Sequence, residues 1–199
     1  MTRDIGIIFS APMVLALLRE ARQPGTGKTM TRRLGRYGPH TKRKGKSTQW
    51  HNVHAGDRLW VRETVLRSKP SHPTSLRCHF AADEAEFKFA SHKSIPAIHM
   101  RMAASRLTLK VTGVKVERLQ DISEADARAE GVLYVPGHGE ISHDELRADP
   151  GFSNFLNCRQ GFELLWGDLH GHQAWMANPE VIAISFTVAK RNILERETR

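Results

Sequence analysis

The stretch Leu107–Val116, LTLKVTGVKV, carries the clearest strand signal in this chain of 199 residues. Apolar residues alternate with polar ones up to Val111, which is the period of a β-strand with one buried face. Gly113 interrupts the alternation and Val114 resumes it, so we expect a bulge or a bend at the glycine. The pattern predicts that strands carry the core of the fold.

Other segments also have strand character. Val181–Val188 is an almost continuous apolar run, which is typical of a central strand in a sheet. Arg58–Thr64 follows the turn signal at Gly56 and alternates, with Leu59 and Val61 on one face. Two shorter strands are expected at Asp4–Phe9 and Leu76–Ala81.

Three segments predict helices. Ala11–Ala21 follows Ser10, a residue type that caps helices. Ser123 and Asp126 resemble a capping box, and the short helix that they begin runs to Glu130. The third helix is expected over Phe152–Leu169, with these residues facing inward: Phe155, Phe162, Leu165 and Trp166. Short strands with few helices predict an α+β fold, a small, partly open β-barrel with helices packed outside.

The length favours one domain over residues 1–189, with loop insertions at about 34–52 and 132–150 and a charged tail at 190–199. The two cysteines, Cys78 and Cys158, are too few for a disulfide framework. No apolar run approaches the roughly 20 residues that span a bilayer. We therefore expect a soluble, cytoplasmic protein without a membrane partner, and the sequence does not determine its oligomeric state.

The net charge of +9 comes from one segment. Residues 21–56 contain nine Lys and Arg and no Asp or Glu, whereas the other 21 basic residues are balanced by 21 acidic ones. A local cluster of this kind favours a polyanionic partner, RNA or DNA first, but a solvated loop that aids solubility is an equal alternative.

The turn Gly27–Arg33, GKTMTRR, combines an amine, hydroxyls and two guanidinium groups. In a helical or turn-like backbone Lys28 and Thr31 share a face, which places a hydroxyl near an amine, as in an activated nucleophile. A phosphate-binding P-loop is excluded, because Arg22 stands where that motif needs a glycine.

Glu130 ends the predicted helix over Ser123–Glu130, where backbone carbonyls disfavour a carboxylate unless a cation is near. A solvated helix end is the ordinary interpretation of such a residue. Glu63 is a second candidate as a buried partner of Lys28, although an edge or strand-end position is the commoner explanation. Trp60 offers a surface for base stacking, and a place in the barrel wall is its commoner role.

Motifs along most of the chain resemble the ASCH domain family, a PUA-like β-barrel group, and in particular its phage and prophage members. The motifs are GKTxTxR from Gly27, VxAGDRLWVRE from Val53, SRLTL from Ser105, ERLQDI from Glu117 with AEG from Ala129, FxxLW from Phe162, and Asn178-Pro179. The chain departs from these relatives before Ser105, where they carry proline and tryptophan and this chain has RMAA.

The resemblance implies a protein directed at nucleic acids or nucleosides. Some members are amidohydrolases that deacylate N4-acetylcytidine, using a lysine, a threonine three residues later and a glutamate that ends the short helix. These positions are Lys28, Thr31 and Glu130 in this chain. Another member is a ribonuclease, and many are presumed to bind RNA.

Two functional hypotheses follow. In the enzyme, Lys28 deprotonates Thr31 or a water, Glu130 orients Lys28 or delivers a proton, and turn N–H groups or Arg33 stabilise the oxyanion. In the alternative, a binding module, cations contact phosphate and an aromatic stacks on bases. The candidate binding residues are Gly27, Arg32, Arg33, Trp60, Glu63, Lys42, Arg43, Lys44 and Lys46.

We expect no metal and no cofactor. The close histidine pairs, His51 with His54 and His170 with His172, lack carboxylate or cysteine partners at ligand spacing. Surface histidines are the better interpretation of both pairs.

Overall fold

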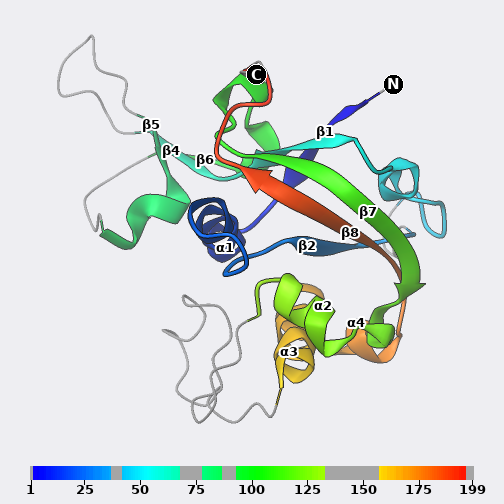
Figure 1. The fold of residues 1–199 in the computed structure, drawn as a ribbon. Coiled ribbons are helices and arrows are strands. Elements are labelled where there is room, and N and C mark those ends of the chain that lie inside the picture. Colours follow the sequence, from blue (N-terminus) through cyan, green and yellow to red (C-terminus); the bar gives the residue numbers. More distant parts are fainter. Residues whose placement is uncertain (1, 37–41, 68–77, 87–92, 133–156, 196–199) are drawn as a thin grey trace, which may run out of the picture.

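A five-stranded mixed sheet forms the centre of the computed structural model (Figure 1). The structure describes residues 2–36, 42–67, 78–86, 93–132 and 157–195. The strand order is β1-β3-β7-β8-β2, with β1 parallel to β3 and every other neighbouring pair antiparallel. The bounds are β1 Asp4–Ile8, β2 Met30–Leu34, β3 Arg58–Arg62, β7 Thr108–Arg118 and β8 Glu180–Ala189.

The two long strands β7 and β8 pair over almost their whole length. Their register shifts between Val111 and Gly113, so the bulge predicted at the glycine is confirmed. β8 lies between β7 and β2, which confirms its predicted central position. Its apolar run is buried, with Ile182 and Ile184 fully inaccessible to solvent.

A second, three-stranded sheet has the order β5-β4-β6, with β4 Val65–Arg67, β5 Cys78–Phe80 and β6 Lys93–Ile95. Of the strand predicted over Leu76–Ala81, residues 76 and 77 lie outside the described residues. Short 3-10 helices connect the strands: η1 Gln49–Asn52, η2 Ala81–Glu86, η3 Ala97–His99, η4 Met102–Ala104 and η5 Leu119–Asp121.

The helices are α1 Ala11–Arg22, α2 Glu124–Ala129, α3 Cys158–His170 and α4 His172–Met176. The capping prediction for α2 is confirmed, since the Ser123 side chain accepts a hydrogen bond from the Asp126 N–H. Ser10 occupies the N-cap of α1 without a side-chain bond to the helix. The predicted start of α3 at Phe152 lies outside the described residues, and α4 was not predicted.

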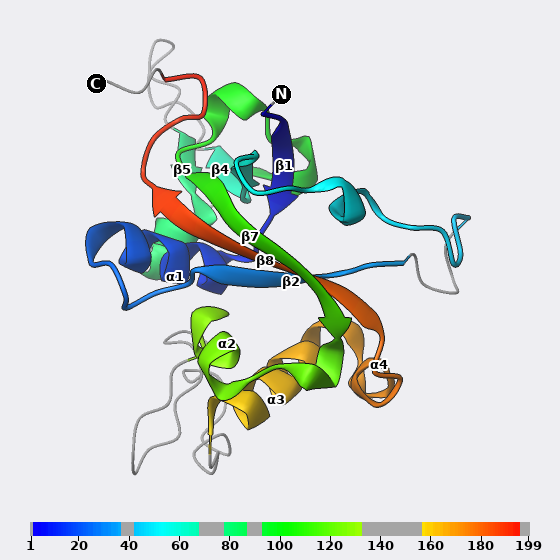
Figure 2. The same ribbon diagram turned by 45° about the vertical axis from the view of Figure 1, so that its right-hand side comes forward.

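The core lies between α1 and the sheet. Leu59, Val61 and Leu109 of the sheet belong to the same hydrophobic cluster as Val14 and Leu17 of α1, and all five side chains are fully buried. Helices α2, α3 and α4 gather at one end of the sheet, away from the strands β4, β5 and β6 (Figures 1 and 2). The inward positions predicted for Phe162, Leu165 and Trp166 of α3 are confirmed by their burial.

These elements confirm an α+β fold, but the predicted barrel stays a prediction. β1 and β2 are the edges of the main sheet, and in the described part of the chain no strand pairing joins them. A side chain spans the two edges instead: Nη2 of Arg33 in β2 donates to the Ile8 carbonyl oxygen of β1 at 2.7 Å. The main sheet is therefore open, with a seam between β1 and β2.

Of the insertion predicted at 34–52, residues 37–41 lie outside the described residues. It begins inside β2, Arg36 forms an isolated bridge with Ser47, and η1 closes the segment. The insertion predicted at 132–150 lies outside the described residues except for Val132. In the tail, Asn192 donates through Nδ2 to three carbonyl oxygens, those of Met102, Ala103 and Ser105.

No helix in the described ranges is long and apolar enough to cross a membrane.

Gly27 is required by its close contact with α1. A Cβ atom at this position would lie 2.2 Å from the Ala16 carbonyl oxygen and 2.5 Å from the Glu20 nitrogen. Gly27→Ala should therefore destabilise the protein by about 1–3 kcal/mol, because backbone atoms must move. The free energy of unfolding in urea measures this loss. Gly113→Ala is the matched control, since its nearest contact would be 3.9 Å away; equal losses in the two variants would contradict the argument.

Candidate functional site

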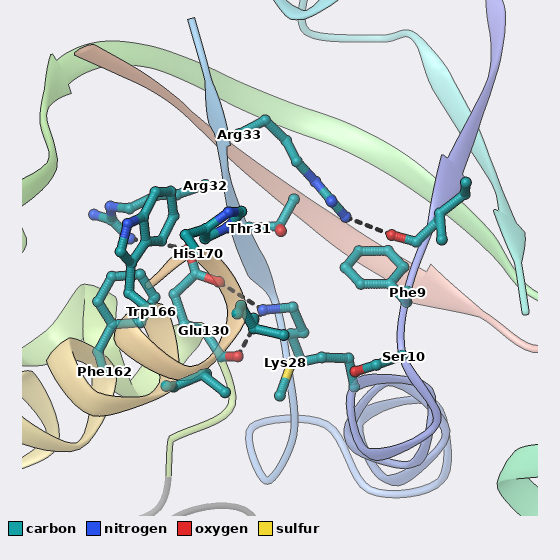
Figure 3. A pocket seen from close by; sticks show the side chains of 14 residues that line it. Phe9, Ser10, Lys28, Thr31, Arg32, Arg33, Glu130, Phe162, Trp166 and His170 are labelled. Carbon is teal, nitrogen blue, oxygen red and sulfur yellow. Dashed lines mark hydrogen bonds and ion pairs between the residues drawn. The ribbon is translucent and has the colours of Figure 1, made fainter. Parts of the chain in front are cut away.

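A pocket of about 210 Å³ lies at the seam of the sheet, between the ends of β1 and β2 and the helix α3. Figure 3 shows charged side chains from β2, from the turn before it and from the C-cap of α2 around the pocket, with aromatic side chains from α3 and from Phe9, which follows β1. Its lining includes the three residues that the sequence marked as catalytic: Lys28, Thr31 and Glu130. The fold thus brings together groups that are about a hundred residues apart.

Lys28 and Glu130 form a buried ion pair in this pocket. The Lys28 Nζ lies 2.6 Å from Glu130 Oε2 and 2.6 Å from the Glu130 carbonyl oxygen. Their side chains are only 2% and 4% exposed. Glu130 caps α2, so the ammonium group satisfies both the carboxylate and a carbonyl at the helix end, where a cation is favoured. The solvated interpretation of Glu130 is therefore wrong.

Hydrogen bonds to three neighbouring elements hold the segment that carries Lys28. The Lys28 N–H donates to Ala16 of α1, and the Thr29 N–H donates to Ala129 of α2. The Thr29 carbonyl accepts from Phe186 of β8. Lys28 therefore enters the pocket from a backbone that is fixed on three sides.

Glu20 prepares the turn before Lys28, and the sequence analysis missed it. Its buried carboxylate accepts hydrogen bonds from the N–H groups of Gly25 and Gly27 at 2.9–3.0 Å. A single glutamate in an amphipathic helix carries no local signal for this role. The contact exists only because the chain turns back over α1.

Arg32 holds the other oxygen of Glu130. Its Nη1 lies 3.2 Å from Glu130 Oε1, and its Nη2 lies 2.7 Å from Glu117 Oε1 and 2.8 Å from Asp126 Oδ2. The Arg32 side chain is fully buried. Its guanidinium donates to protein carboxylates and so positions Glu130; Arg32 also lines the pocket, and its role in binding stays a prediction.

Burial governs the protonation of Lys28. Desolvation lowers the pKa of Lys28, and Glu130 acts in the opposite direction by attraction and hydrogen bonding. Arg33 and Arg32 lower the pKa further by repulsion. The balance is a lysine pKa below its ordinary value, which is the condition for an amine that gives up and takes back a proton.

Thr31 lies in β2 opposite Ile184 of β8, so the predicted helical or turn-like geometry for it is wrong. Its side chain is buried and lines the pocket beside Lys28 (Figure 3). Among the described residues no hydrogen bond joins the Thr31 hydroxyl to Lys28. The two groups share the pocket because the strand begins at Met30, directly after the fixed turn.

Aromatic side chains form the pocket wall: Phe9, Phe162, Trp166 and His170. The ring centroids of Trp166 and His170 are 4.3 Å apart. Partial burial and the positive charge of Arg33 lower the pKa of His170, so its ring is neutral at neutral pH. His170 is exposed, as predicted, but it also borders the pocket, and the helical spacing from Trp166 is the signal that was available for it.

Trp60 and Glu63 lie outside this pocket. Trp60 stands opposite Gly6 of β1, with the Arg62 guanidinium 5.1 Å from its ring centroid. Glu63 is buried and pairs with Arg106, whose Nε lies 2.8 Å from Glu63 Oε1. The hypothesis that Glu63 is the buried partner of Lys28 is therefore wrong.

The basic cluster also lies away from the pocket. Lys42, Arg43, Lys44 and Lys46 are exposed in a turn that follows β2, whereas Lys28 precedes the strand. No group of three or more metal-ligating side chains occurs in the described ranges.

Comparisons with known proteins add little. No family model matches the sequence, and no curated protein matches it. The fold is similar to that of protein EF3133 from Enterococcus faecalis V583, a DUF984 protein, with a TM-score of 0.41 and 10% sequence identity. That match covers 100% of this chain and 87% of the other. A likeness this weak carries no argument, so the site rests on the geometry of this chain.

Arg32 neutralises three carboxylates, so its loss should be costly. Arg32→Gln should lower the free energy of unfolding by about 3–5 kcal/mol, because Asp126 would lose its cation and the buried carboxylates of Glu117 and Glu130 would each keep only one of two cations. Urea denaturation measures the loss. Lys115→Gln removes an exposed cation from the same Glu117 and should change stability little. A small, equal effect in both variants would show that the network is not stabilising.

Proposed function

We propose that this protein is a nucleoside-directed hydrolase that cleaves the amide of N4-acylated cytidine. The proposal is carried by one observation: Lys28 and Glu130 are ion-paired at 2.6 Å within a small pocket that Thr31 also lines. These are the three positions for which the resemblance to ASCH amidohydrolases implies a catalytic role. The PUA-like barrel of that family is part of the same proposal, with the seam between β1 and β2 as its opening.

The pocket suits a ring more than a large ligand. Its volume of about 210 Å³ is below the roughly 300–1,000 Å³ of sites for drug-sized molecules. Aromatic walls favour a planar base, and the buried charges at the bottom favour a polar group at its edge. An acylated cytosine offers both, with the amide as its polar edge.

The mechanism begins with a proton transfer inside the ion pair. Glu130 takes a proton from Lys28, which leaves a neutral amine beside a carboxylic acid, and burial favours this neutral pair. The amine then accepts the proton of Thr31, or of a water oriented by Thr31, as that oxygen attacks the amide carbonyl. Glu130 donates its proton to the departing N4 nitrogen. Water completes the hydrolysis, and the products are cytidine and a carboxylic acid.

Stabilisation of the oxyanion comes from side chains in this proposal. The N–H groups of Gly27, Lys28 and Thr29 already donate to protein oxygens, so the turn has no free donors there. The Lys28 ammonium carries three N–H bonds, of which two point at Glu130. The third is available for the developing negative charge.

A binding module for RNA or DNA is the second candidate. It is favoured by the exposed basic turn over residues 42–46. This turn follows the end of β2, whereas Lys28 of the pocket precedes its start. Charge of this kind attracts phosphate backbones irrespective of sequence. Another ASCH member is a ribonuclease, so its partner is also a nucleic acid. The two candidates differ in whether the protein converts a substrate in the pocket or only binds nucleic acid.

Three substitutions separate catalysis from binding. Thr31→Ala should abolish hydrolysis of N4-acetylcytidine while affinity for cytidine stays nearly unchanged, because the lost contact belongs to the transition state. Lys28→Ala should impair both the hydrolysis of N4-acetylcytidine and the affinity for cytidine. Glu130→Gln keeps the shape of the side chain and should lower kcat by roughly 100-fold or more, because proton transfer is lost. Chromatographic detection of the released cytidine over time measures the rate of each variant.

The outcome against this proposal is specific. If the wild-type protein hydrolyses no acylated cytidine but binds RNA in a manner that depends on Lys28, the hydrolase is excluded and the binding module stands. Equal activity in the wild type and Thr31→Ala would remove only the role of Thr31.

The basic turn should act through charge alone. Replacing Lys42, Arg43, Lys44 and Lys46 with glutamine should weaken RNA and DNA binding similarly for different sequences and should flatten the dependence of affinity on salt. Filter binding at several salt concentrations measures both. Affinity that does not change at low salt would show that the turn is only a solvated surface.

A further inference from the structure

Arg33 differs from the other cations of the pocket because it has no ion-pair partner among the described residues. Its Nη2 donates to the Ile8 carbonyl oxygen at 2.7 Å. Its Nε is buried without a hydrogen bond, and its Nη1 makes none with the residues that the structure describes. Burial lowers the pKa of Arg33 to about 10 and Glu130 opposes this shift, so the group remains cationic at neutral pH.

The neighbouring cations are already neutralised. Lys28 is paired with Glu130, and Arg32 is paired with Glu117, Asp126 and Glu130. Arg33 is therefore the cation of the pocket that no carboxylate of the described residues contacts. A desolvated charge without a counter-ion is costly, and an anionic group on a ligand would offset that cost.

The guanidinium is also held in a fixed orientation. Its central carbon lies 4.9 Å from the centroid of Phe9 and 5.6 Å from that of Trp50. The bond to Ile8 fixes one end, so the plane of the group is set before a ligand arrives (Figure 3). A fixed, planar fork of N–H donors is the geometry that binds phosphate through two hydrogen bonds.

The position of Arg33 fits a phosphate attached to a nucleoside. The pocket is too small for base, sugar and phosphate together, so a base against Lys28 and Glu130 leaves the sugar and phosphate at the rim. Arg33 is half-buried and His170 is exposed there, and both line the pocket.

We propose that the pocket binds a phosphorylated cytidine in preference to the free nucleoside, and that Arg33 is the residue that holds the phosphate. This inference rests on the proposed function for the identity of the base. The phosphate belongs either to a free nucleotide or to the backbone of an RNA, and both present the same oxygens to Arg33.

Binding of reaction products tests the inference without turnover. Calorimetry with cytidine and with cytidine 5′-monophosphate should show about ten- to hundredfold tighter binding of the nucleotide, as expected for charge-assisted hydrogen bonds. Arg33→Gln should remove this preference and leave cytidine affinity unchanged. Arg33→Lys, which keeps the charge and loses the fork, should restore only part of it.

The controls separate phosphate binding from general effects. Arg101→Gln removes an exposed cation that does not line the pocket, and it should keep the full preference. Added salt should weaken binding of the nucleotide more than binding of cytidine. If Arg33→Gln does not fold, Arg33→Lys and the salt dependence still decide the question. A short cytidine-containing RNA that binds more tightly than the nucleotide, with the same dependence on Arg33, identifies the backbone as the source.

Two results overturn the inference: equal affinity of the wild type for cytidine and its monophosphate, or an equal loss of both affinities in Arg33→Gln. These failures differ from failure of the proposed function. If the protein hydrolyses N4-acetylcytidine but shows no preference for the nucleotide, only the inference about Arg33 is contradicted. If it prefers the nucleotide in a manner that depends on Arg33 but hydrolyses neither the acylated nucleoside nor the acylated nucleotide, only the proposed hydrolase function is contradicted.

Discussion

The buried ion pair between Lys28 and Glu130 is the interaction on which the site depends. It joins the end of α2 to the turn before β2, and it does so where solvent is excluded. A pair of this kind gains little stability against an apolar replacement, because both charges lose their hydration. The surrounding contacts offset that loss: Arg32 holds the second carboxylate oxygen, and the α2 carbonyl accepts from the ammonium.

The pocket that this pair lines lies at the open seam of the main sheet. β1 and β2 do not pair with each other in the described structure, so the space between them is closed by side chains and not by backbone hydrogen bonds. Arg33 crosses the seam, and Phe9 packs beneath its guanidinium. β2 therefore supplies Thr31 and Arg33 to the pocket, and the turn before it supplies Lys28.

Much of the fold follows from local patterns. Alternation identifies β3 and β7, a continuous apolar run identifies β8, and a capping serine identifies the start of α2. Local patterns did not identify the short elements: β4 and β6 have three residues each, and α4 has five. Elements of this length contain too few residues to show a period, and their structure comes from the partners on which they pack.

The sequence by itself determined the strands β1, β3, β7 and β8, the bulge at Gly113, the helix that ends at Glu130 and the choice of Lys28, Thr31 and Glu130 as candidates. Only the tertiary structure decided the partners of the charged groups. It paired Glu63 with Arg106, turned Arg32 toward three carboxylates and left Arg33 to face the pocket. Alternating residues of β2 point to opposite faces, and the neighbouring strands and helices set what each face meets. Those neighbours are far away in sequence, so no local pattern specifies which charge becomes a structural clamp and which one remains for a ligand.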